Sequence, residues 1–331
     1  MAQAFTKSNG RETTTGKRCR WLWLCQGALA VFFLLAMLGR AAIAQTPTPS
    51  SDTDLQAASS LLLTKHYAQA ISLLRKLVPA HENQPEAHIM LAYALFREDQ
   101  PAASLREYTR AAQLRRPTAE DLKWVALDYV LLGDYNDAQK WMFQSLRMND
   151  SSADSWYDMG RIEYTQNLFK NAERCFQRAL ALSPRDIDAE NNLGLTYEAL
   201  FRWNDAIAAY RTAIAWQQGS PHPSPEPLLN LGTALLNQNH RAQALAPLQQ
   251  AAVLAPRNPR VLRQLARANF QLGRLADAES ELRTALTISP NEAALHFQLG
   301  RVLSKEGKTE QAKAEFAKVA ALDGTHSSLS R

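Results

Sequence analysis

The sequence predicts an all-α protein built from about eight consecutive helix pairs. Small residues recur every 34 positions along most of the 331-residue chain. Within each interval, apolar residues twice follow the i, i+3, i+4, i+7 spacing that places them on one face of a helix. Packing positions recur at a fixed period, whereas a catalytic site occurs once. The recurring residues are therefore interpreted as the core of a repeated structure.

The period is clearest at position 20 of each repeat, counted with Ala153 as position 1 of one of them. Seven alanines and one serine occupy this position: Ala70, Ser104, Ala138, Ala172, Ala206, Ala244, Ala278 and Ala312. Every step is 34 residues except one step of 38. The repeats accordingly start at residues 51, 85, 119, 153, 187, 225, 259 and 293, and we expect them to fill 51–326.

Each repeat has the pattern of two helices. In the repeat from residue 153, Trp156 and Gly160 belong to the first helix, at positions 4 and 8, and Ala172 and Phe176 belong to the second, at positions 20 and 24. Small residues at positions 8 and 20 let the two helices approach closely. One pair alone buries too little apolar surface, so neighbouring pairs must stack. Trp156 is thus predicted to be a core residue rather than a ligand-binding one.

Three segments depart from the repeat. The four additional residues fall in a loop with four prolines, 217–227, where proline prevents the neighbouring helices from continuing. Both a long surface loop and a hinge fit this composition. Residues 45–50 have the composition of a linker, and residues 327–331 that of a terminal tail.

The N-terminus has the pattern of a secretory signal peptide. A basic stretch, GKRCR, precedes the apolar run WLWLCQGALAVFFLLAML, and Ala42 and Ala44 follow as the small residues of a cleavage site. Residues 1–44 are therefore predicted to be a cleaved signal peptide, which places the protein in the periplasm or cell envelope. The alternative is an uncleaved inner-membrane anchor with the repeats outside the cytoplasm, because the apolar run approaches the length of a membrane span.

The charge distribution argues against a nucleic-acid partner. The chain has a net charge of +5, but residues 1–44 contain six basic residues and one acidic residue. The remainder is balanced, so it lacks the basic surface that nucleic-acid binding needs. Membrane contact is expected only through an uncleaved leader. Cys175 is the only cysteine after residue 44, so no intramolecular disulfide is expected.

The sequence contains none of the common catalytic or metal-site motifs. The patterns GxGxxG, GxSxG and HExxH, the P-loop and paired cysteines are all missing. His88 and His296 both occupy position 4, where other repeats have Trp or Leu, so we interpret them as packed residues. We therefore expect no enzymatic activity, no cofactor and no metal.

The repeat resembles the tetratricopeptide repeat, whose 34-residue unit is a pair of antiparallel helices. The resemblance covers nearly all of 51–326 and is weakest in the first repeat, where Asp54 occupies position 4 and Ala58 replaces Gly. It implies a right-handed superhelical α-solenoid that binds a protein or peptide in a concave groove. It also implies that positions 2, 5, 6, 9, 12 and 13 of each repeat line that groove.

Residues at these inward positions form a candidate peptide-binding site. The last four repeats have amides at position 6: Asn192, Asn230, Gln264 and Gln298. An amide offers a donor and an acceptor, which match the backbone of an extended peptide; solvation of a polar face is the alternative. The third and fourth repeats contribute aromatic residues: Trp124, Tyr157 and Tyr164. The seventh and eighth contribute a basic end: Arg260, Arg263, Arg267, Arg301 and Lys305.

No acidic residue occupies an inward position of the seventh or eighth repeat, so we expect the basic end to be matched by solvent or by a partner with an acidic stretch. The predicted function is that of an exported, non-enzymatic scaffold or adaptor that binds a protein or extended peptide in its groove. The alternative is a cell-envelope assembly factor, similar to those of pilus or secretion-system biogenesis, that acts through its convex face or its ends. A third class, an accessory domain of an envelope enzyme, would require a fused catalytic segment.

The leader generates the first testable prediction. N-terminal sequencing of the protein recovered from its native host should begin at Gln45, because the small residues Ala42 and Ala44 precede this position. Recovery of the intact leader in the membrane fraction would instead establish the anchor.

Overall fold

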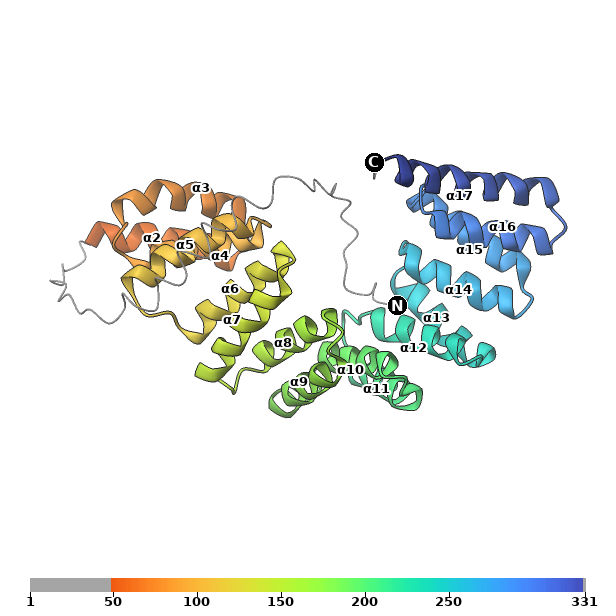
Figure 1. Ribbon diagram of the computed structural model, residues 1–331, viewed down its shortest axis with the longest axis horizontal. Coiled ribbons are helices and arrows are strands. Elements are labelled where there is room, and N and C mark those ends of the chain that lie inside the picture. The colour runs from red at the N-terminus through yellow and green to blue at the C-terminus, as the bar shows by residue number, and fades with distance from the viewer. Residues whose placement is uncertain (1–48, 330–331) are drawn as a thin grey trace. The chain divides into compact units, whose positions relative to one another are not determined.

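The computed structural model describes residues 49–329, and the predicted signal peptide and cleavage site lie outside this range. Within it the chain forms sixteen α-helices, one short 3-10 helix and no strand, which confirms the prediction of an all-α solenoid of helix pairs. The chain divides into two compact units, and the boundary in the sequence lies between Gln166 and Asn167. Each unit is described by itself (Figure 1).

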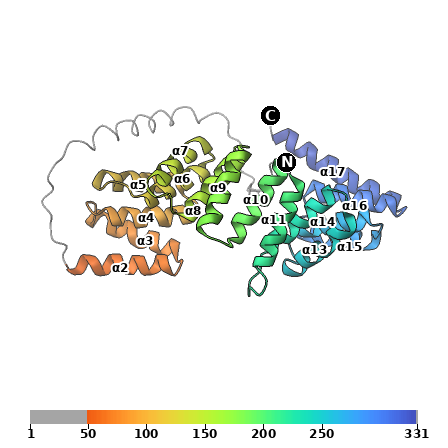
Figure 2. The same ribbon diagram turned by 90° about the horizontal axis from the view of Figure 1, so that it is seen from below.

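Unit 1 contains seven α-helices and the 3-10 helix, packed in chain order (Figure 2). These are α2 (Pro49–Leu63), α3 (Tyr67–Leu77), η1 (Val78–Ala80), α4 (Pro85–Arg97), α5 (Pro101–Leu114), α6 (Ala119–Leu132), α7 (Tyr135–Met148) and α8 (Ala153–Thr165). The first helix begins at Pro49, inside the segment expected to be a linker. Proline is tolerated there because an N–H group in the first turn has no acceptor inside the helix, so no hydrogen bond is lost.

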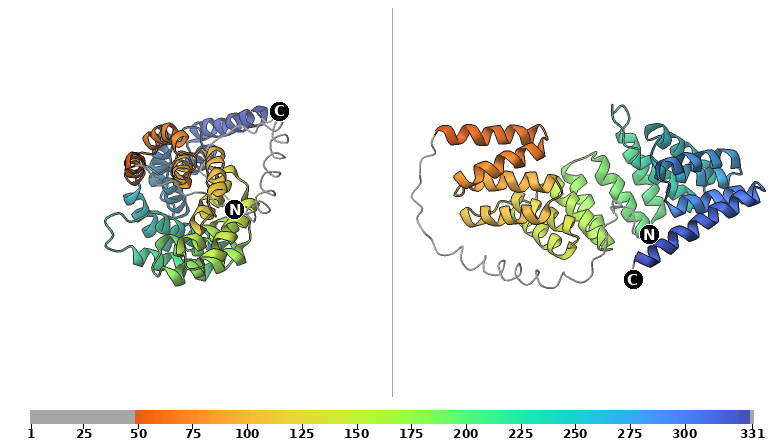
Figure 3. Two further views of the ribbon diagram at one scale, coloured as in Figure 1. Left: turned by 90° about the vertical axis from the view of Figure 1, so that its left-hand side faces the viewer. Right: turned by 90° about the horizontal axis from the view of Figure 1, so that it is seen from above.

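Unit 2 contains nine α-helices, again packed in chain order (Figure 3). These are α9 (Phe169–Leu182), α10 (Ile187–Ala199), α11 (Trp203–Trp216), α12 (Glu226–Asn237), α13 (Arg241–Leu254), α14 (Pro259–Gln271), α15 (Leu275–Ile288), α16 (Ala293–Lys305) and α17 (Thr309–Leu329). The last helix continues into the segment expected to be a tail, where no proline interrupts it. We call the first helix of each repeat the A helix and the second the B helix.

Five of the described helices, α6, α7, α8, α10 and α14, begin at a short polar side chain that accepts a hydrogen bond from the first turn. Thr118 and Asp121 form a reciprocal capping box at α6: the Asp121 N–H donates to Thr118 Oγ1 at 3.2 Å, and the Thr118 N–H donates to the Asp121 carboxylate at 2.7 Å. Asp186 caps α10 and Asn258 caps α14 in the same manner, each by accepting from a backbone N–H. These caps satisfy N–H groups that have no partner inside the helix.

Position 8 of the A helix lies in close contact with position 24 of the B helix. A Cβ atom added to Gly194 would lie 2.5 Å from the Tyr210 ring, and one added to Gly300 would lie 2.6 Å from the Phe316 ring. Gly232 is packed just as tightly against Leu248. Any side chain at these glycines would push the two helices apart.

Residues 217–227 were expected to form a surface loop or a hinge. One side chain links the two ends of this loop. Gln217, which is buried, donates from Nε2 to the Ser224 carbonyl at 3.0 Å and accepts from the Ser224 N–H at 2.9 Å. The last two residues of the expected loop are helical, because α12 begins at Glu226. The two bonds from Gln217 close the loop across seven residues.

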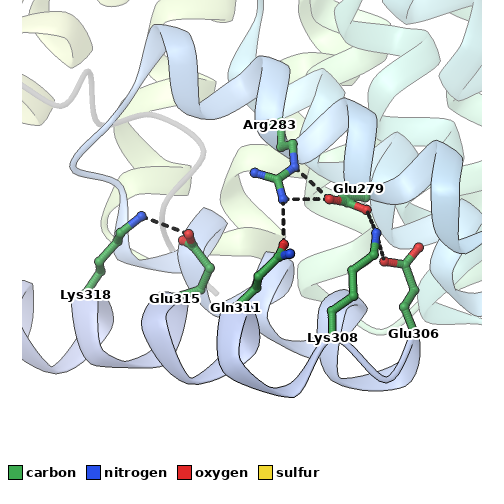
Figure 4. Close-up of polar contacts among 7 residues, drawn as sticks. All are labelled: Glu279, Arg283, Glu306, Lys308, Gln311, Glu315 and Lys318. Carbon is green, nitrogen blue, oxygen red and sulfur yellow. Dashed lines mark hydrogen bonds and ion pairs between the residues drawn. The ribbon is translucent and has the colours of Figure 1, made fainter.

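A network of ion pairs holds the turn before the last helix to α15, and one hydrogen bond from Arg283 reaches the last helix itself (Figure 4). Lys308 lies 2.6 Å from one oxygen of Glu279 and 2.9 Å from Glu306, while Arg283 binds the other Glu279 oxygen and donates to Gln311 at 3.2 Å. Lys308 and Arg283 lower the pKa of the Glu279 carboxyl to about 2. The Glu279 carboxylate therefore remains charged throughout the neutral and mildly acidic range.

The turn between the two helices of every repeat contains one residue with positive φ. All eight residues occupy position 15: Lys65, Asp99, Gly133, Asn167, Phe201, Asn239, Gly273 and Gly307. Glycine, asparagine and aspartate tolerate this left-handed conformation, whereas other residues lose about 1–2 kcal/mol through contact of Cβ with the backbone. Phe201 is therefore strained, and its side chain is 79% exposed and gains little burial in return.

Replacing Phe201 by Asn should raise the free energy of unfolding by about 1 kcal/mol, because asparagine adopts the left-handed conformation at lower cost. The reverse exchange at an equivalent turn, Asn239→Phe, should lower it by a similar amount. Urea unfolding followed by circular dichroism measures both changes. A lower unfolding midpoint for Phe201→Asn would show that the ring contributes more than the strain.

The core of unit 1 contains a carboxyl group that the apolar pattern does not anticipate. Asp128 on α6 is fully buried, and Ser104 Oγ–H donates to its Oδ2 at 2.6 Å, while Oδ1 has no hydrogen-bond partner. Burial raises the pKa of Asp128 to about 8, and the hydrogen bond from Ser104 offsets this only in part. The folded chain therefore holds this carboxyl protonated at neutral pH.

Because the pKa of Asp128 is higher in the folded chain than in the unfolded one, unit 1 should lose stability as pH rises from about 4 to about 8. In Asp128→Asn this contribution to the pH dependence should disappear, because an amide does not ionise. Thermal unfolding at pH 5 and pH 8 checks this, with the exposed Asp150→Asn as control. An unchanged pH profile in Asp128→Asn would contradict the assignment.

Candidate peptide-binding surface

The inward positions of the A helices contain the sequence-predicted site residues, and we call this surface the A-helix face of each unit. In unit 2 it is formed by α10, α12, α14 and α16, which are packed as successive neighbours. Asn192 and Asn230 are both buried there. Asn230 Nδ2 donates to Asn191 Oδ1 at 2.9 Å, which joins α12 to α10. One amide of the predicted row is thus engaged in holding two A helices together.

Gln264 and Gln298 differ from the two asparagines. The side-chain oxygen Oε1 of each is inaccessible to solvent and receives no hydrogen bond within the described residues. Gln271, at inward position 13 of α14, has a third such oxygen. A buried acceptor without a donor costs about 1–3 kcal/mol. Each of these side chains must turn before its oxygen can accept a hydrogen bond from a ligand.

The basic end of unit 2 does not have the free charges that the sequence suggested. Arg263 Nη1 lies 2.7 Å from a carboxylate oxygen of Glu292, and Arg260 Nη1 lies 3.6 Å from Glu226. The expectation that no acidic residue matches this row is wrong for these two residues. Their partners come from the last position of the same repeat and from the preceding repeat, and stacking brings both within reach.

Arg267 is also engaged within the chain. Its Nη2 donates to Asn237 Oδ1 at 3.1 Å, which joins α14 to α12. Partial burial lowers the pKa of this guanidinium from its ordinary value. Arg267 consequently belongs to the packing between A helices.

Arg301 and Lys305 are the predicted basic residues that form no ion pair within the described chain. Both are exposed, and both lie over the ring of Phe270, with the Arg301 Cζ 5.0 Å and the Lys305 Nζ 4.9 Å from the ring centroid. A cation over an aromatic ring gains about 0.5–1 kcal/mol at an exposed site. The ring holds the two charges in place while leaving them accessible to an anionic group.

The aromatic residues of unit 1 are largely occupied with one another. The Trp124 ring lies 4.9 Å from Tyr93 and 5.2 Å from Phe96, measured between centroids, and Lys123 Nζ lies 4.7 Å from its centroid. Arg161 lies over Tyr157 at 5.8 Å. Tyr164 is 92% buried, so only a small part of it can reach a ligand. Trp124 and Tyr157 remain partly exposed on this face.

A partly buried carboxylate lies on the same face as these aromatic residues. Burial raises the pKa of Asp158, at position 6 of α8, to about 6, although Arg161 and Lys123 act against this shift. The nearest oxygen of Asp158 is 3.7 Å from Arg161 Nη1. The A-helix face of unit 1 therefore changes its charge in the mildly acidic range.

Sequence reasoning missed a hydrogen bond made by position 4. Trp156 Nε1, His88 Nε2 and His296 Nε2 each donate to the carbonyl six residues earlier, at 2.8, 3.1 and 2.8 Å. The other ring nitrogen of each histidine contacts a carboxylate at position 23, Glu107 at 2.7 Å and Glu315 at 2.5 Å. The two histidines are buried and packed, as expected. The sequence signal for these contacts is that a glutamate follows each of the two histidines after 19 residues.

Over residues 49–329, no helix is both long and apolar enough to cross a membrane. In the same range, no group of three or more His, Cys, Asp or Glu side chains could hold a metal ion. Cys175 is a free, buried thiol.

Comparison with curated proteins finds relatives of low identity. The protein O-mannosyl-transferase TMTC3 of Mus musculus is 26% identical over 221 residues, which cover 63% of this chain and 21% of that protein. The TPR repeat-containing protein MJ1428 of Methanocaldococcus jannaschii is 26% identical over 152 residues, which cover 43% of this chain and 26% of that protein. The chain thus spans about a fifth to a quarter of the length of these relatives.

Solved structures share the fold at lower identity. PilW, described as a type IV pilus biogenesis factor, has a TM-score of 0.56 and 21% identity, covering 61% of this chain and 92% of its own. The protein pilF of Pseudomonas aeruginosa has a TM-score of 0.55 and 19% identity, covering 62% and 91%. A chain of the APC/C hetero-tetramer Cut9–Hcn1 has a TM-score of 0.58 and 16% identity, covering 82% and 53%.

Family comparison identifies the repeat itself. One sequence profile of the tetratricopeptide repeat matches residues 126–186, 157–223 and 229–293, and a second matches residues 270–329. Together they cover more than half of the chain and the helix pairs that form the A-helix face of unit 2. The chain therefore belongs to the tetratricopeptide repeat family.

Proposed function

We propose that this chain is an exported, non-enzymatic scaffold that binds a protein or an extended peptide on its A-helix face. The observation that carries the proposal is the pair of buried oxygens, Gln264 Oε1 and Gln298 Oε1, that receive no hydrogen bond. Their equivalent position on successive A helices suits a ligand that presents N–H groups at intervals. An extended peptide presents such groups along its backbone whatever its side chains are.

The two free cations beside these amides indicate the chemistry of the partner. Arg301 and Lys305 lie on the same helix as Gln298 and have no carboxylate within ion-pair distance in the described chain. A peptide with an acidic stretch would place its carboxylates there, which sets its direction and its rate of encounter more than its affinity. Arg260, Arg263 and Arg267 contribute by positioning the A helices.

The non-enzymatic part of the proposal is supported by the engagement of the two buried histidines. Both nitrogens of His88 and of His296 are bound to packed neighbours, which leaves neither ring free to transfer a proton to a substrate. The relative TMTC3 is named a transferase, but the match covers only 21% of it. Export remains part of the proposal, and it rests on the leader pattern.

A second candidate function is that of a cell-envelope assembly factor that acts through the B helices or the ends. The likeness to PilW and pilF, which covers about three fifths of this chain, favours it. The two functions differ in a simple competition. An excess of free extended peptide should displace a partner bound to the A-helix face and should leave a partner bound to the B helices in place.

The double variant Gln264→Met and Gln298→Met tests the role of the amides. Methionine keeps the shape of the side chain and removes the unpaired oxygen, so the folded chain should be as stable as before or more stable. Affinity for an extended peptide, selected by display against the purified chain, should fall by about 1–2 kcal/mol, since two hydrogen bonds are lost. Fluorescence anisotropy of the labelled peptide measures this.

Two controls make the result specific. Gln249→Met and Gln250→Met, an exposed amide pair on the B helix α13, should leave affinity unchanged. A peptide methylated at its backbone nitrogens should bind the unmodified chain as weakly as the ordinary peptide binds the double variant. If methylated and ordinary peptides bind equally well, the amides do not hold the peptide backbone.

A further inference from the structure

The last helix pair has a surface that differs from the equivalent surface of every preceding repeat. Five positions form it: 5 and 9 on the A helix, and 21, 24 and 28 on the B helix. In the seven preceding repeats every residue at these positions is buried or half-buried. In the last repeat all five residues are exposed: Phe297, Arg301, Lys313, Phe316 and Ala320. We call these five residues the terminal surface.

The exposure of the terminal surface has a simple cause. Each preceding B helix packs against the A helix that follows it, whereas no A helix follows α17 within residues 49–329. Position 24 shows the effect most clearly, because its residue is at most 4% exposed in the seven preceding repeats and Phe316 is 37% exposed. Phe316 still packs against Gly300 of α16. The ring is therefore fixed in place while part of it faces solvent.

Two aromatic rings form the apolar part of the terminal surface. Phe297 is 48% exposed, and its ring centroid lies 5.9 Å from that of Phe316. The two rings belong to α16 and α17, so the apolar part spans both helices of the last pair. The end of a helical solenoid needs a polar outer face for solubility. Two exposed phenylalanines therefore indicate a surface that a partner covers.

The chain itself shows what fits this surface. In the fifth repeat the side chains at positions 21, 24 and 28 belong to one apolar cluster with three leucines of the following A helix, α12: Leu228, Leu231 and Leu235. These leucines occupy positions 4, 7 and 11, which is the spacing of one helical face. The terminal surface has the same place in the last repeat. An amphipathic helix with large apolar residues at this spacing therefore fits it.

The charge at position 21 indicates a further property of this helix. In two repeats of unit 2, a glutamate at position 21 forms an ion pair with a cation at position 16 of the next repeat. The pairs are Glu173 with Arg202 at 2.7 Å and Glu279 with Lys308 at 2.6 Å. In the last repeat position 21 is Lys313, which is paired only with the largely exposed Glu310 in the described chain. The matching residue of a partner, at position 16, is therefore a carboxylate.

A second copy of the chain does not supply such a helix. Its first A helix, α2, has the small, exposed residues Ala57 and Ser60 at positions 7 and 10, where the other repeats have residues that are buried or half-buried. A two-fold dimer would instead pair the terminal surface with itself. Arg301 and Lys313 would then face a surface with the same two cations, which is unfavourable.

We infer that the terminal surface binds an amphipathic helix of a partner protein, which takes the place of a following A helix. The apolar stripe of this helix covers Phe297 and Phe316, and a carboxylate that follows the helix at position 16 pairs with Lys313. Large apolar side chains that pack on buried rings supply most of the energy of such an interface. The site is separate from the glutamines of the proposed function, and only Arg301 belongs to both.

A peptide with the sequence of residues 225–240 tests the inference, because α12 covers the equivalent surface of the fifth repeat. It carries fluorescein and a lactam bridge that holds it helical, and it is made with His240→Glu or with His240→Lys at position 16. Fluorescence anisotropy should show saturable binding of the Glu peptide to the purified chain below about 1 mM. Replacing Leu228, Leu231 and Leu235 of the peptide by Gln should weaken binding at least about tenfold.

Variants of the chain locate the site. Ala320→Glu should weaken binding of both peptides at least about tenfold, since it places a carboxylate where all preceding repeats have an apolar residue. Ala314→Glu is the matched control, because position 22 is exposed in all eight repeats, and it should leave affinity unchanged. Lys313→Glu should reverse the preference, so that the Lys peptide binds about threefold more tightly than the Glu peptide.

Three results would overturn the inference. They are the absence of saturable binding by the Glu peptide, equal binding by Ala320→Glu and the unmodified chain, and a dimer in sedimentation equilibrium that Ala320→Glu dissociates. Such a dimer would assign the surface to a second copy. Ala314 and Ala320 are both exposed, so neither variant requires the core to repack. Gln264 and Gln298 are unchanged in every variant, so failure here leaves the proposed function untouched.

Discussion

In the pairs α10–α11, α12–α13 and α16–α17, a glycine of the A helix lies directly against a large side chain of the B helix. Gly194 against Tyr210 shows the consequence, since a single added Cβ would overlap the ring at 2.5 Å. Interiors are packed so closely that such an overlap cannot be absorbed without moving a helix. This contact fixes the distance between the two helices of a pair. The pair then presents a fixed surface on which its neighbour stacks.

The stacking of pairs determines which charges are free. Arg263 and Glu292 are far apart in one repeat, yet the start of the next A helix brings the carboxylate to 2.7 Å from the guanidinium. Arg202 reaches Glu173 and Lys308 reaches Glu279 over the same separation of 29 residues. Bridges between successive helix pairs are thus a regular feature of unit 2. Some of the charged residues that the sequence suggests as a binding surface instead form ion pairs within the chain.

Departures from the repeat are the places where the fold gives up stability. Phe201 occupies a turn position that suits glycine or asparagine. Asp128 places a carboxyl group in the core of unit 1, where Ser104 donates a hydrogen bond to one of its oxygens. Each residue is unusual only in comparison with its equivalents in the same chain. In a repeat protein each residue can be compared with the residues at the same position of the other seven repeats. An unusual residue is recognised by this comparison.

The sequence by itself determined the helix pairs, because the 34-residue period and the 3.6-residue spacing are local properties of the chain. It also identified the position 6 amides and the packed histidines, since both follow from position within the repeat. It did not reveal that Asn230 bonds to Asn191, that Arg263 is neutralised by Glu292, or that Gln264 Oε1 is left without a donor. Those facts depend on how one repeat is rotated and shifted against the next. Only the tertiary structure decides this, because side chains 29 to 39 residues apart meet through stacking and not through sequence spacing.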